Sequence, residues 1–381
     1  MFNKTFRETL KCGTIALWGI LTACTPVHTH TSPAAEGGTD SLAYARHFEI
    51  TRTDSYKRIT IFNPWNNLQV LDRIYLVRDS LTQVPSDGLR IQLPIRRLMI
   101  ASASHIGYIE ALGLLDRVVL CPDTTQIYSP ALKAQVRDGQ TAAFGDPYAV
   151  NTETILHTRP DLIMMIGYAG ADQSTERLRS LNQPVVCNVE WTEPTILGRA
   201  EWIKLFGALF DLEALADSVF DQTAGRYHQL CERAQQAGEH PKILPGHPFR
   251  GTWYMPGGQA GMARMFADAG GSYAYSDRPE AESVGIDFET VVRDFWQADL
   301  WIGADARSMK ELLGEDSRFA LLKPVTDRQV YNNRLHTSAT GGNLYWETTQ
   351  VHPDWLLEDL IRVLHPGLLP EGGFHYLQHL Q

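Results

Sequence analysis

Two glutamates, Glu153 and Glu289, stand at the same place in two similar passages of the chain. Each passage begins a short amphipathic segment, reaches an aspartate, Asp161 or Asp299, and enters an apolar run typical of a buried strand. An exposed carboxylate of this kind can pair with a cation on another protein, and it can equally be a first-turn residue favoured by the helix dipole. Because the same unit occurs twice, the repetition predicts two similar lobes.

The residues that could hold a metal or act as nucleophiles are scattered. His375 and His379 are spaced as ligands on one helix face can be, but they lie near the end of the chain without an obvious third ligand. His28 and His30 lie in a stretch of linker composition. Three cysteines follow Cys24, an odd number that cannot all pair: Cys121, Cys187 and Cys231. We therefore expect no metal site, no catalytic residue, no cofactor and no essential disulfide.

The composition is that of a globular protein. The chain has 381 residues, of which 44% are hydrophobic and 20% charged, enough for one or two cores. Its net charge is −10, and no basic cluster follows the N-terminal region. Phosphate binding requires a concentrated basic surface, so nucleic acid is not an expected partner.

The N-terminus has the order of a secretory signal. Basic residues precede the apolar stretch 13–23, which is too short to span a bilayer but has the length of a signal-peptide core. The stretch ends in Leu21-Thr-Ala-Cys24, which is similar to the lipobox of bacterial lipoproteins, where the cysteine thiol takes the lipid. An ordinary buried cysteine after a signal peptide is the alternative. We expect residues 1–23 to be a lipoprotein signal peptide and Cys24 to be lipidated.

Residues 24–41 have the composition of a tether that holds a domain off the membrane without folding. Contact with the membrane is then expected through the lipid anchor only, with the domain facing the periplasm. An aspartate after the lipidated cysteine favours retention in the inner membrane, and Thr25-Pro26 lacks one. Its absence favours the outer membrane.

The remaining chain falls into one β region, two α/β regions and one helical region. Residues 42–96 alternate polar and apolar side chains and predict an N-terminal β extension in the form of a meander. Strands alternate with helices over 97–193 and again over 238–381, which predicts parallel sheets whose loops at the strand carboxyl ends hold any ligand.

Between the two α/β regions, residues 194–237 repeat their apolar positions at helical spacing. This predicts one long helix, or two abutting helices with a break near Gly207 or Asp211. The predicted fold class is therefore α/β, with two Rossmann-like lobes joined by a long backbone helix and a ligand cleft between them.

The lipobox, the two lobes and the joining helix together resemble the class III periplasmic substrate-binding proteins that serve ABC importers of iron-siderophores, haem and cobalamin. The sequence is most similar to iron-type lipoproteins of Bacteroidota. The matching segments are 97–105, 112–118, 151–153, 159–162, 197–203, 252–258, 268–271, 286–289, 346–347 and 353–357.

The resemblance implies transport without chemistry by a monomer that is not an enzyme. In that class one glutamate on each lobe pairs with arginines of the permease dimer, and Glu153 and Glu289 stand at the matching positions. Two exposed carboxylates held apart by a stiff helix would suit a two-fold partner such as an ABC permease dimer. A purely helix-capping role for each glutamate stays open.

The resemblance also places the ligand between the lobes, where aromatic rings could cover a flat or apolar chelate and an arginine could pair with its carboxylates. The candidates are His105, Tyr148, Tyr168 and Trp191 from the first lobe, and Arg250, Trp253, Tyr254, Tyr275, Tyr345 and Trp346 from the second. Trp253 and Tyr254 alternate in a strand, so one of them can instead be core. Tyr168 or His105 could ligate haem iron directly.

The expected ligand is an iron chelate, a siderophore or haem, with cobalamin or another corrinoid as the alternative. A metal-chelatase-like enzyme is a further alternative, because related two-lobed folds also house such chemistry. It is less favoured than a binding protein. The loop 256–261 departs from the family pattern, since Gln259-Ala-Gly261 stand where a tyrosine is usual. This departure leaves the class of ligand open.

Overall fold

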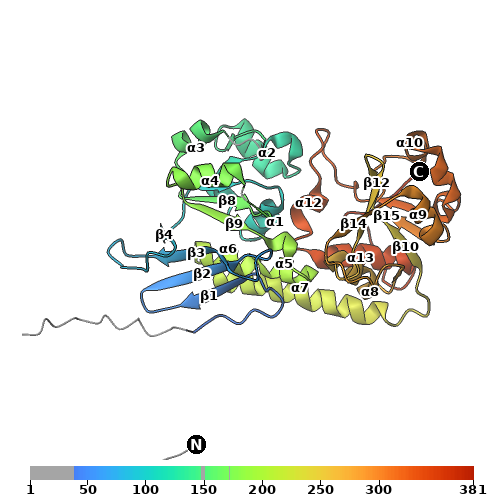
Figure 1. Ribbon diagram of the computed structural model, residues 1–381, viewed down its shortest axis with the longest axis horizontal. Helices are drawn as coiled ribbons and strands as arrows, with labels where there is room; N and C mark the ends of the chain where they lie inside the picture. The colour runs from blue at the N-terminus through green and yellow to red at the C-terminus, as the bar shows by residue number, and fades with distance from the viewer. Residues whose placement is uncertain (1–37, 147–150, 171) are drawn as a thin grey trace, which may run out of the picture. The chain divides into compact units, whose positions relative to one another are not determined.

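The computed structural model describes residues 38–146, 151–170 and 172–381. Glu36–Gln381 form one compact unit (Figure 1). The expected signal peptide, Cys24, the paired histidines His28 and His30, and Tyr148 lie outside the described residues. Over the described ranges, no helix is both long enough and apolar enough to cross a bilayer.

A four-stranded sheet precedes the first lobe. Its strands are β1 Phe48–Arg52, β2 Tyr56–Phe62, β3 Val70–Val77 and β4 Leu89–Gln92, in the order β1-β2-β3-β4. The first three pair antiparallel, but β4 pairs parallel with β3, so the sheet is not the pure meander that the alternation predicts. A parallel neighbour cannot follow through a hairpin, and residues 78–88 supply the longer connection.

The sheet also takes in residues that the composition assigns to the tether. Thr39 pairs with Thr51, and the backbone N–H of Asp40 donates to Ile50 at 2.9 Å. The expected tether over 24–41 therefore ends before these residues. Backbone pairing of this kind leaves no trace in a composition of small and polar side chains.

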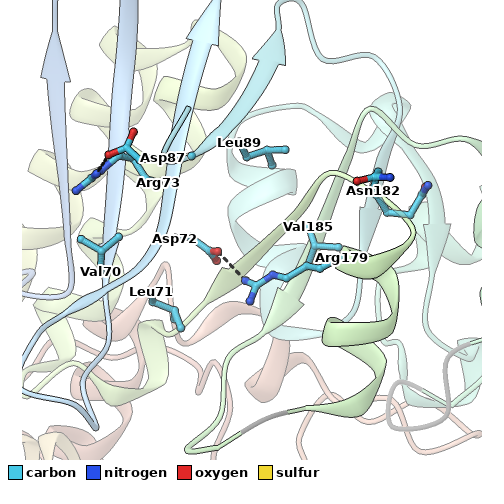
Figure 2. A pocket seen from close by; sticks show the side chains of 11 residues that line it. Val70, Leu71, Asp72, Arg73, Asp87, Leu89, Arg179, Asn182 and Val185 are labelled. Atoms are coloured by element: carbon cyan, nitrogen blue, oxygen red, sulfur yellow. Dashed lines mark hydrogen bonds and ion pairs between the residues drawn. The ribbon is translucent and has the colours of Figure 1, made fainter. Parts of the chain in front are cut away.

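Asp72 of β3 fixes the extension against the first lobe. Its Oδ1 lies 2.6 Å from Nη2 of Arg179, and its Oδ2 accepts the backbone N–H of Cys187 at 2.8 Å (Figure 2). Burial raises the pKa of Asp72 to about 6, against the opposing effect of the Arg179 cation. A cavity of about 600 Å³ opens beside this pair, but its charges are paired with one another, Asp72 with Arg179 and Arg73 with Asp87.

The N-lobe is a five-stranded parallel sheet in the order β7-β6-β5-β8-β9. Its strands are β5 Leu98–Ile100, β6 Val118–Cys121, β7 Ala142–Ala143, β8 Leu162–Ile166 and β9 Val185–Asn188. Its helices are α1 Ser104–Ala111, α2 Pro130–Arg137, α3 Thr152–Thr158 and α4 Gln173–Ser180. The strands β5, β8 and β9 are buried almost throughout, as expected for a parallel sheet with covered faces, whereas the short edge strand β7 is exposed.

The region 194–237 forms three helices rather than one or two, which corrects the expected long helix. They are α5 Ile196–Glu201, α6 Ile203–Phe210 and α7 Glu213–Ala234, the last with 22 residues. Trp202 separates α5 from α6. Asp211, one of the two expected break points, separates α6 from α7 with a left-handed φ of 58°. Aspartate tolerates this conformation, and Lys57 binds its carboxylate at 2.6 Å, so a polar contact stabilises the break at this position.

The C-lobe contains a five-stranded sheet, β13-β10-β15-β16-β17, that is parallel except for β17, and a separate antiparallel sheet, β11-β12-β14. The strands are β10 Lys242–Pro245, β11 Pro248–Phe249, β12 Thr252–Pro256, β13 Ser272–Tyr273, β14 Ser283–Ile286, β15 Leu300–Ile302, β16 Val330–Asn332 and β17 Gln378–His379. The helices are α8 Gly261–Asp268, α9 Phe288–Phe295, α10 Met309–Glu315, α11 Lys323–Thr326, α12 Leu344–Thr348 and α13 Pro353–Leu364.

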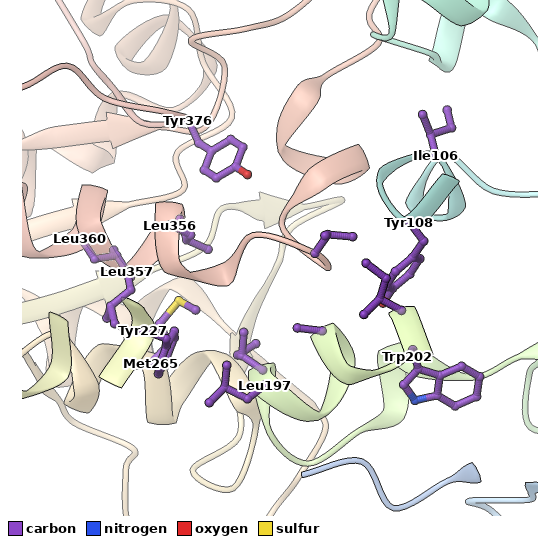
Figure 3. Packing of buried hydrophobic residues seen from close by; sticks show 14 of the residues in the cluster. Ile106, Tyr108, Leu197, Trp202, Tyr227, Met265, Leu356, Leu357, Leu360 and Tyr376 are labelled. Carbon is purple, nitrogen blue, oxygen red and sulfur yellow. The ribbon is translucent and has the colours of Figure 1, made fainter. Parts of the chain in front are cut away.

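Helix α7 connects the lobes by packing against α6 and against α13. Tyr227 on α7 donates its hydroxyl to Asp268 at the end of α8 at 2.7 Å. One apolar cluster runs from Trp202 and Leu197 through Tyr227 to Leu356 on α13 (Figure 3). The two lobes therefore share a continuous core.

Candidate ligand-binding site

A cavity of about 390 Å³ lies where the strands β10, β15 and β16 of the C-lobe end. Ligands of parallel sheets bind at this edge. The lining residues are Pro245, Gly246, Tyr254, Pro256, Met262, Phe266, Ser283, Ile302, Gly303, Asp305, Asn333, Arg334, Thr337, Gly341, Asn343, Tyr345, Trp346, Leu356, Leu360 and Leu377. Three of the aromatic candidates, Tyr254, Tyr345 and Trp346, are among them.

The three aromatic rings reach the cavity from two elements. Tyr254 projects from β12 and is 49% exposed, and Trp346 on α12 is 58% exposed. The ring of Tyr345 meets that of Trp346 edge to face at 4.7 Å. Burial raises the pKa of Tyr345 to about 12, so its phenol stays neutral near pH 7. These rings offer a largely apolar wall that also carries the hydroxyl groups of Tyr254 and Tyr345.

Arg334 and Asp305 line the same cavity and were not among the candidates. Their Nη1 and Oδ1 atoms lie 2.7 Å apart. Each follows a strand of the parallel sheet, and Asn332, at the end of β16, accepts the backbone N–H of Arg334 at 3.0 Å. Their place in the sequence shortly after a predicted strand is the one signal that could have identified Asp305 and Arg334 as site residues.

A second contact between the lobes runs through residues 336–348, which we call the clasp. Helix α12 of the clasp packs on α1 of the N-lobe. Glu347 accepts the backbone N–H groups of Tyr128 and Ser129 just before α2. A Cβ on Gly342 would lie 2.0 Å from the carbonyl oxygen of Ile127, so only glycine permits this approach. The clasp therefore fixes Tyr345 and Trp346 relative to the N-lobe.

Glu347 is fully buried within the clasp. Burial raises its pKa to about 7, and the two backbone hydrogen bonds oppose that rise. Glu110 of α1 also raises the pKa of this carboxyl, whereas Lys133 of α2 lowers it. Ser129, which donates its hydroxyl to Glu110, links these groups at the start of α2.

Two of the N-lobe candidates lie together after β8 and β9. Tyr168 and Trp191 are each 38% exposed, and their ring centroids are 6.2 Å apart. The indole N–H of Trp191 donates to the carbonyl of Gly167 at 3.1 Å, and Trp65 packs on its ring at 5.7 Å. The carboxyl end of the N-lobe sheet thus carries an exposed aromatic group of its own.

Four candidates lie elsewhere than expected. His105 is fully buried in the first turn of α1 beside Phe206, with no hydrogen-bond partner at either ring nitrogen among the described residues. Burial lowers its pKa to about 3. Helix α1 begins one residue before His105 and turns its side chain into the core. The structure therefore corrects the expectation that His105 contacts the ligand or its iron.

Trp253 and Tyr275 are also core residues. Trp253 is 1% exposed and donates its indole N–H to the carbonyl of Pro245 at 2.8 Å. Tyr275 is buried and donates its hydroxyl to Asp294 at 2.6 Å. Arg250 is exposed on the turn between β11 and β12, with φ 50°, and its guanidinium lies against Phe249. None of these three is among the residues that line the C-lobe cavity.

The two glutamates occupy matching exposed positions. Glu153 lies in the first turn of α3 after the N-cap Asn151, and Glu289 in the first turn of α9 after the N-cap Asp287. Glu289 lies 3.5 Å from Nη1 of Arg318, an exposed and therefore weak pair. Both carboxylates are in place to serve the helix dipole, and both are open to a partner.

The described ranges contain no group of three or more His, Cys, Asp or Glu side chains that could hold a metal ion. His375 stacks on Trp355 with ring centroids 5.1 Å apart, while His379 of β17 packs on Tyr331 of β16. The two histidines of the tail thus have separate packing partners.

The family model for Periplasmic binding protein matches residues 99–333. The chain belongs to this family. It is therefore a solute receptor of an ABC importer and not an enzyme, and the predicted two-lobed α/β fold is confirmed.

The chain is also similar to an uncharacterized lipoprotein, and it shares its fold with solved structures. The chain is 23% identical over 365 residues to an uncharacterized lipoprotein of Methanocaldococcus jannaschii, covering 89% of this chain and 85% of that protein. A periplasmic haem-binding protein from Pseudomonas aeruginosa superposes with a TM-score of 0.59 at 17% identity, covering 76% of this chain and 99% of that one. A possible iron-binding solute-binding protein from Staphylococcus epidermidis gives a TM-score of 0.55 at 15% identity, covering 71% and 99%.

Proposed function

We propose that this member of the family captures an iron chelate, a siderophore or haem, and delivers it to an ABC permease. The observation that carries the proposal is the cavity at the carboxyl ends of β10, β15 and β16, with its wall of Tyr254, Tyr345 and Trp346. Aromatic rings cover a large metal chelate at low cost in rotamer entropy. The similar structures described as haem- or iron-binding support the same class of ligand.

In this proposal, Tyr254, Tyr345 and Trp346 contact the ligand from the C-lobe, and Tyr168 and Trp191 contact it from the N-lobe. A corrinoid is the second candidate ligand, because the same rings would cover a corrin as well as a porphyrin. The mature protein is proposed to be a monomer anchored through Cys24, facing the periplasm from the outer membrane, as in lipoproteins of Bacteroidota. Glu153 and Glu289 are proposed to dock on the permease dimer.

The ligand can be identified on protein purified from its own host. Native mass spectrometry gives the mass of the bound molecule, and the absorption spectrum gives its class. A Soret band indicates haem, a charge-transfer band a ferric siderophore, and a corrin spectrum a corrinoid. Protein that carries and binds none of these classes would contradict the proposal.

A further inference from the structure

The C-lobe cavity is balanced in charge. Among its described lining residues the charged side chains are Arg334 and Asp305, and these two pair at 2.7 Å. The other polar side chains of the lining are neutral: Ser283, Asn333, Thr337 and Asn343, with the phenols Tyr254 and Tyr345. The lining therefore has no net formal charge with which to neutralise an anion.

A further cation, Arg199, lies near the cavity and has an acidic neighbour. Arg199 in α5 lies close enough to Tyr345 to affect the pKa of its phenol, which burial raises. Glu190 is fully buried near Arg199, and burial raises the pKa of this carboxyl while Ser104 and Arg199 oppose the rise. Ser104 donates its hydroxyl to Glu190 at 2.9 Å. Arg199 thus has an acidic neighbour, as Arg334 does.

The facing edge of the N-lobe carries acidic side chains. The loops after its five strands are 101–103, 122–129, 144–151, 167–172 and 189–195, and their sequences contain no lysine or arginine. The carboxylates in these loops are Asp123, Asp146, Asp172, Glu190 and Glu193. Glu190 and Glu193 are buried, whereas Asp123 and Asp172 are partly exposed. An anion that approached the described part of these loops would therefore meet carboxylates and no basic side chain of the loops. The net charge of −10 for the chain acts against anions at longer range as well.

Burying a charged group is costly unless an opposite charge or several hydrogen bonds compensate it. We infer that the ligand of this site carries little or no net negative charge, as an uncharged ferric hydroxamate does, and is not a polyanionic ferric catecholate or haem with ionised propionates. The inference rests on the proposed function and narrows it. The neutral amides and hydroxyls of the lining match a chelate whose outer surface presents amide and hydroxamate oxygens.

The test is isothermal titration calorimetry of the mature protein with four probes. They are an uncharged ferric trihydroxamate, a triply anionic ferric tricatecholate, haemin and cyanocobalamin. We expect the trihydroxamate to bind at least about tenfold more tightly than the tricatecholate or haemin, a difference of about 1.4 kcal/mol.

A matched pair of variants tests the electrostatic cause. Asp305→Asn removes the carboxylate that neutralises Arg334 and should shift the ratio of affinities about threefold toward the tricatecholate, as expected for an ion pair near the surface. Asp316→Asn is the control, because Asp316 also pairs with an arginine at 2.7 Å, Arg318, but lies outside the cavity lining. It should leave the ratio unchanged.

The outcomes separate this inference from the proposed function. Tricatecholate or haemin binding as tightly as the trihydroxamate would overturn the charge inference and leave an iron chelate as ligand. Binding of cyanocobalamin alone would overturn the iron chelate and support an uncharged ligand. Binding of none of the four would overturn both.

Discussion

Trp253 and Tyr254 are neighbours on β12, but Trp253 is buried in the core and Tyr254 is exposed in the cavity wall. Substituting each in turn therefore tests stability and ligand binding separately. We expect Tyr254→Ala to weaken ligand binding by about 1–3 kcal/mol, because an exposed ring in the cavity wall is lost. Trp253→Ala should instead lower the free energy of unfolding by about 3–5 kcal/mol, because a buried indole and its hydrogen bond are removed. Titration calorimetry with the chelate measures the change in binding, and thermal unfolding measures the change in stability.

The same comparison tests the site itself. If Tyr254→Ala binds the ligand as the wild type does, the C-lobe cavity is not the ligand site. Trp346→Ala is a second variant of the same wall and should weaken binding with little loss of stability, since Trp346 is largely exposed.

The raised pKa of Glu347 predicts that pH affects the stability of the clasp. The pKa of this carboxyl is raised to about 7 in the folded protein, from 4.5 for an ordinary glutamate. Between these two pH values the carboxyl is therefore protonated in the folded state and ionised in the unfolded chain. The contribution of Glu347 to stability is therefore greatest at acidic pH and falls as pH rises through about 7. We expect the melting temperature of the wild type, relative to that of Glu347→Gln, to decline over this range.

Differential scanning calorimetry of both proteins between about pH 5 and pH 8 measures this difference. Taking the difference removes the contributions of other carboxyls with raised pKa values, such as Asp72 and Asp354. A difference in melting temperature that does not change with pH, or that grows as pH rises, would show that Glu347 is ionised throughout.

At the scale of elements, strands and helices with strong periodicity could be predicted, whereas the parts that complete the site could not. The run Leu162–Ile166 is a buried strand, as its apolar pattern predicts. The clasp has no such signal, because α12 spans only Leu344–Thr348 and is held by backbone contacts of Glu347 and Gly342. The break at Asp211 was one of the two predicted positions, and its backbone angle and its contact with Lys57 favour it over Gly207. The break at Trp202 was not predicted.

The candidate site was predictable to a similar degree. The resemblance and the suitability of aromatic rings for a flat chelate led to Tyr254, Tyr345 and Trp346, which line the cavity. The same reasoning failed for His105, because its place after a strand does not reveal that it lies in the first turn of a helix and faces the core. It also omitted Arg334, since an arginine after a strand is more often solvated than part of a cavity.

At the scale of the whole molecule, the matching places of Glu153 and Glu289 bear on how the protein meets its permease. We expect Glu153→Ala with Glu289→Ala to impair uptake while leaving ligand affinity nearly unchanged, because neither glutamate lines the cavity. The matched control is Glu176→Ala with Glu311→Ala, since these are also exposed first-turn glutamates, one on each lobe. Transport assays and titration calorimetry measure the two properties.

Equal loss of uptake in the two double variants would mean that Glu153 and Glu289 serve only their helices. If the Glu153 and Glu289 variant lost ligand affinity but transported normally at saturating ligand, the two glutamates would serve ligand binding and not docking on the permease.

The connections between the lobes predict little relative motion when ligand binds. The reason is not a single helix over 194–237, as the sequence suggests, but two contacts acting together. Helix α7 packs against both α6 and α13, and the clasp packs α12 on α1 while Glu347 accepts backbone hydrogen bonds just before α2. Closing a hinge would break both contacts, whereas lobes linked only by strands need rotate a few dihedral angles. We expect the radius of gyration to change by no more than about one ångström on binding.

Small-angle scattering of the mature protein with and without its ligand measures this change. The variant Gly342→Ala serves as the comparison, because its Cβ would collide with the carbonyl of Ile127 and loosen the clasp without altering α7. We expect a larger ligand-dependent change in this variant than in the wild type. A compaction of several ångströms in the wild type would show that neither α7 nor the clasp restrains the lobes, and that closure itself carries the signal of occupancy to the permease.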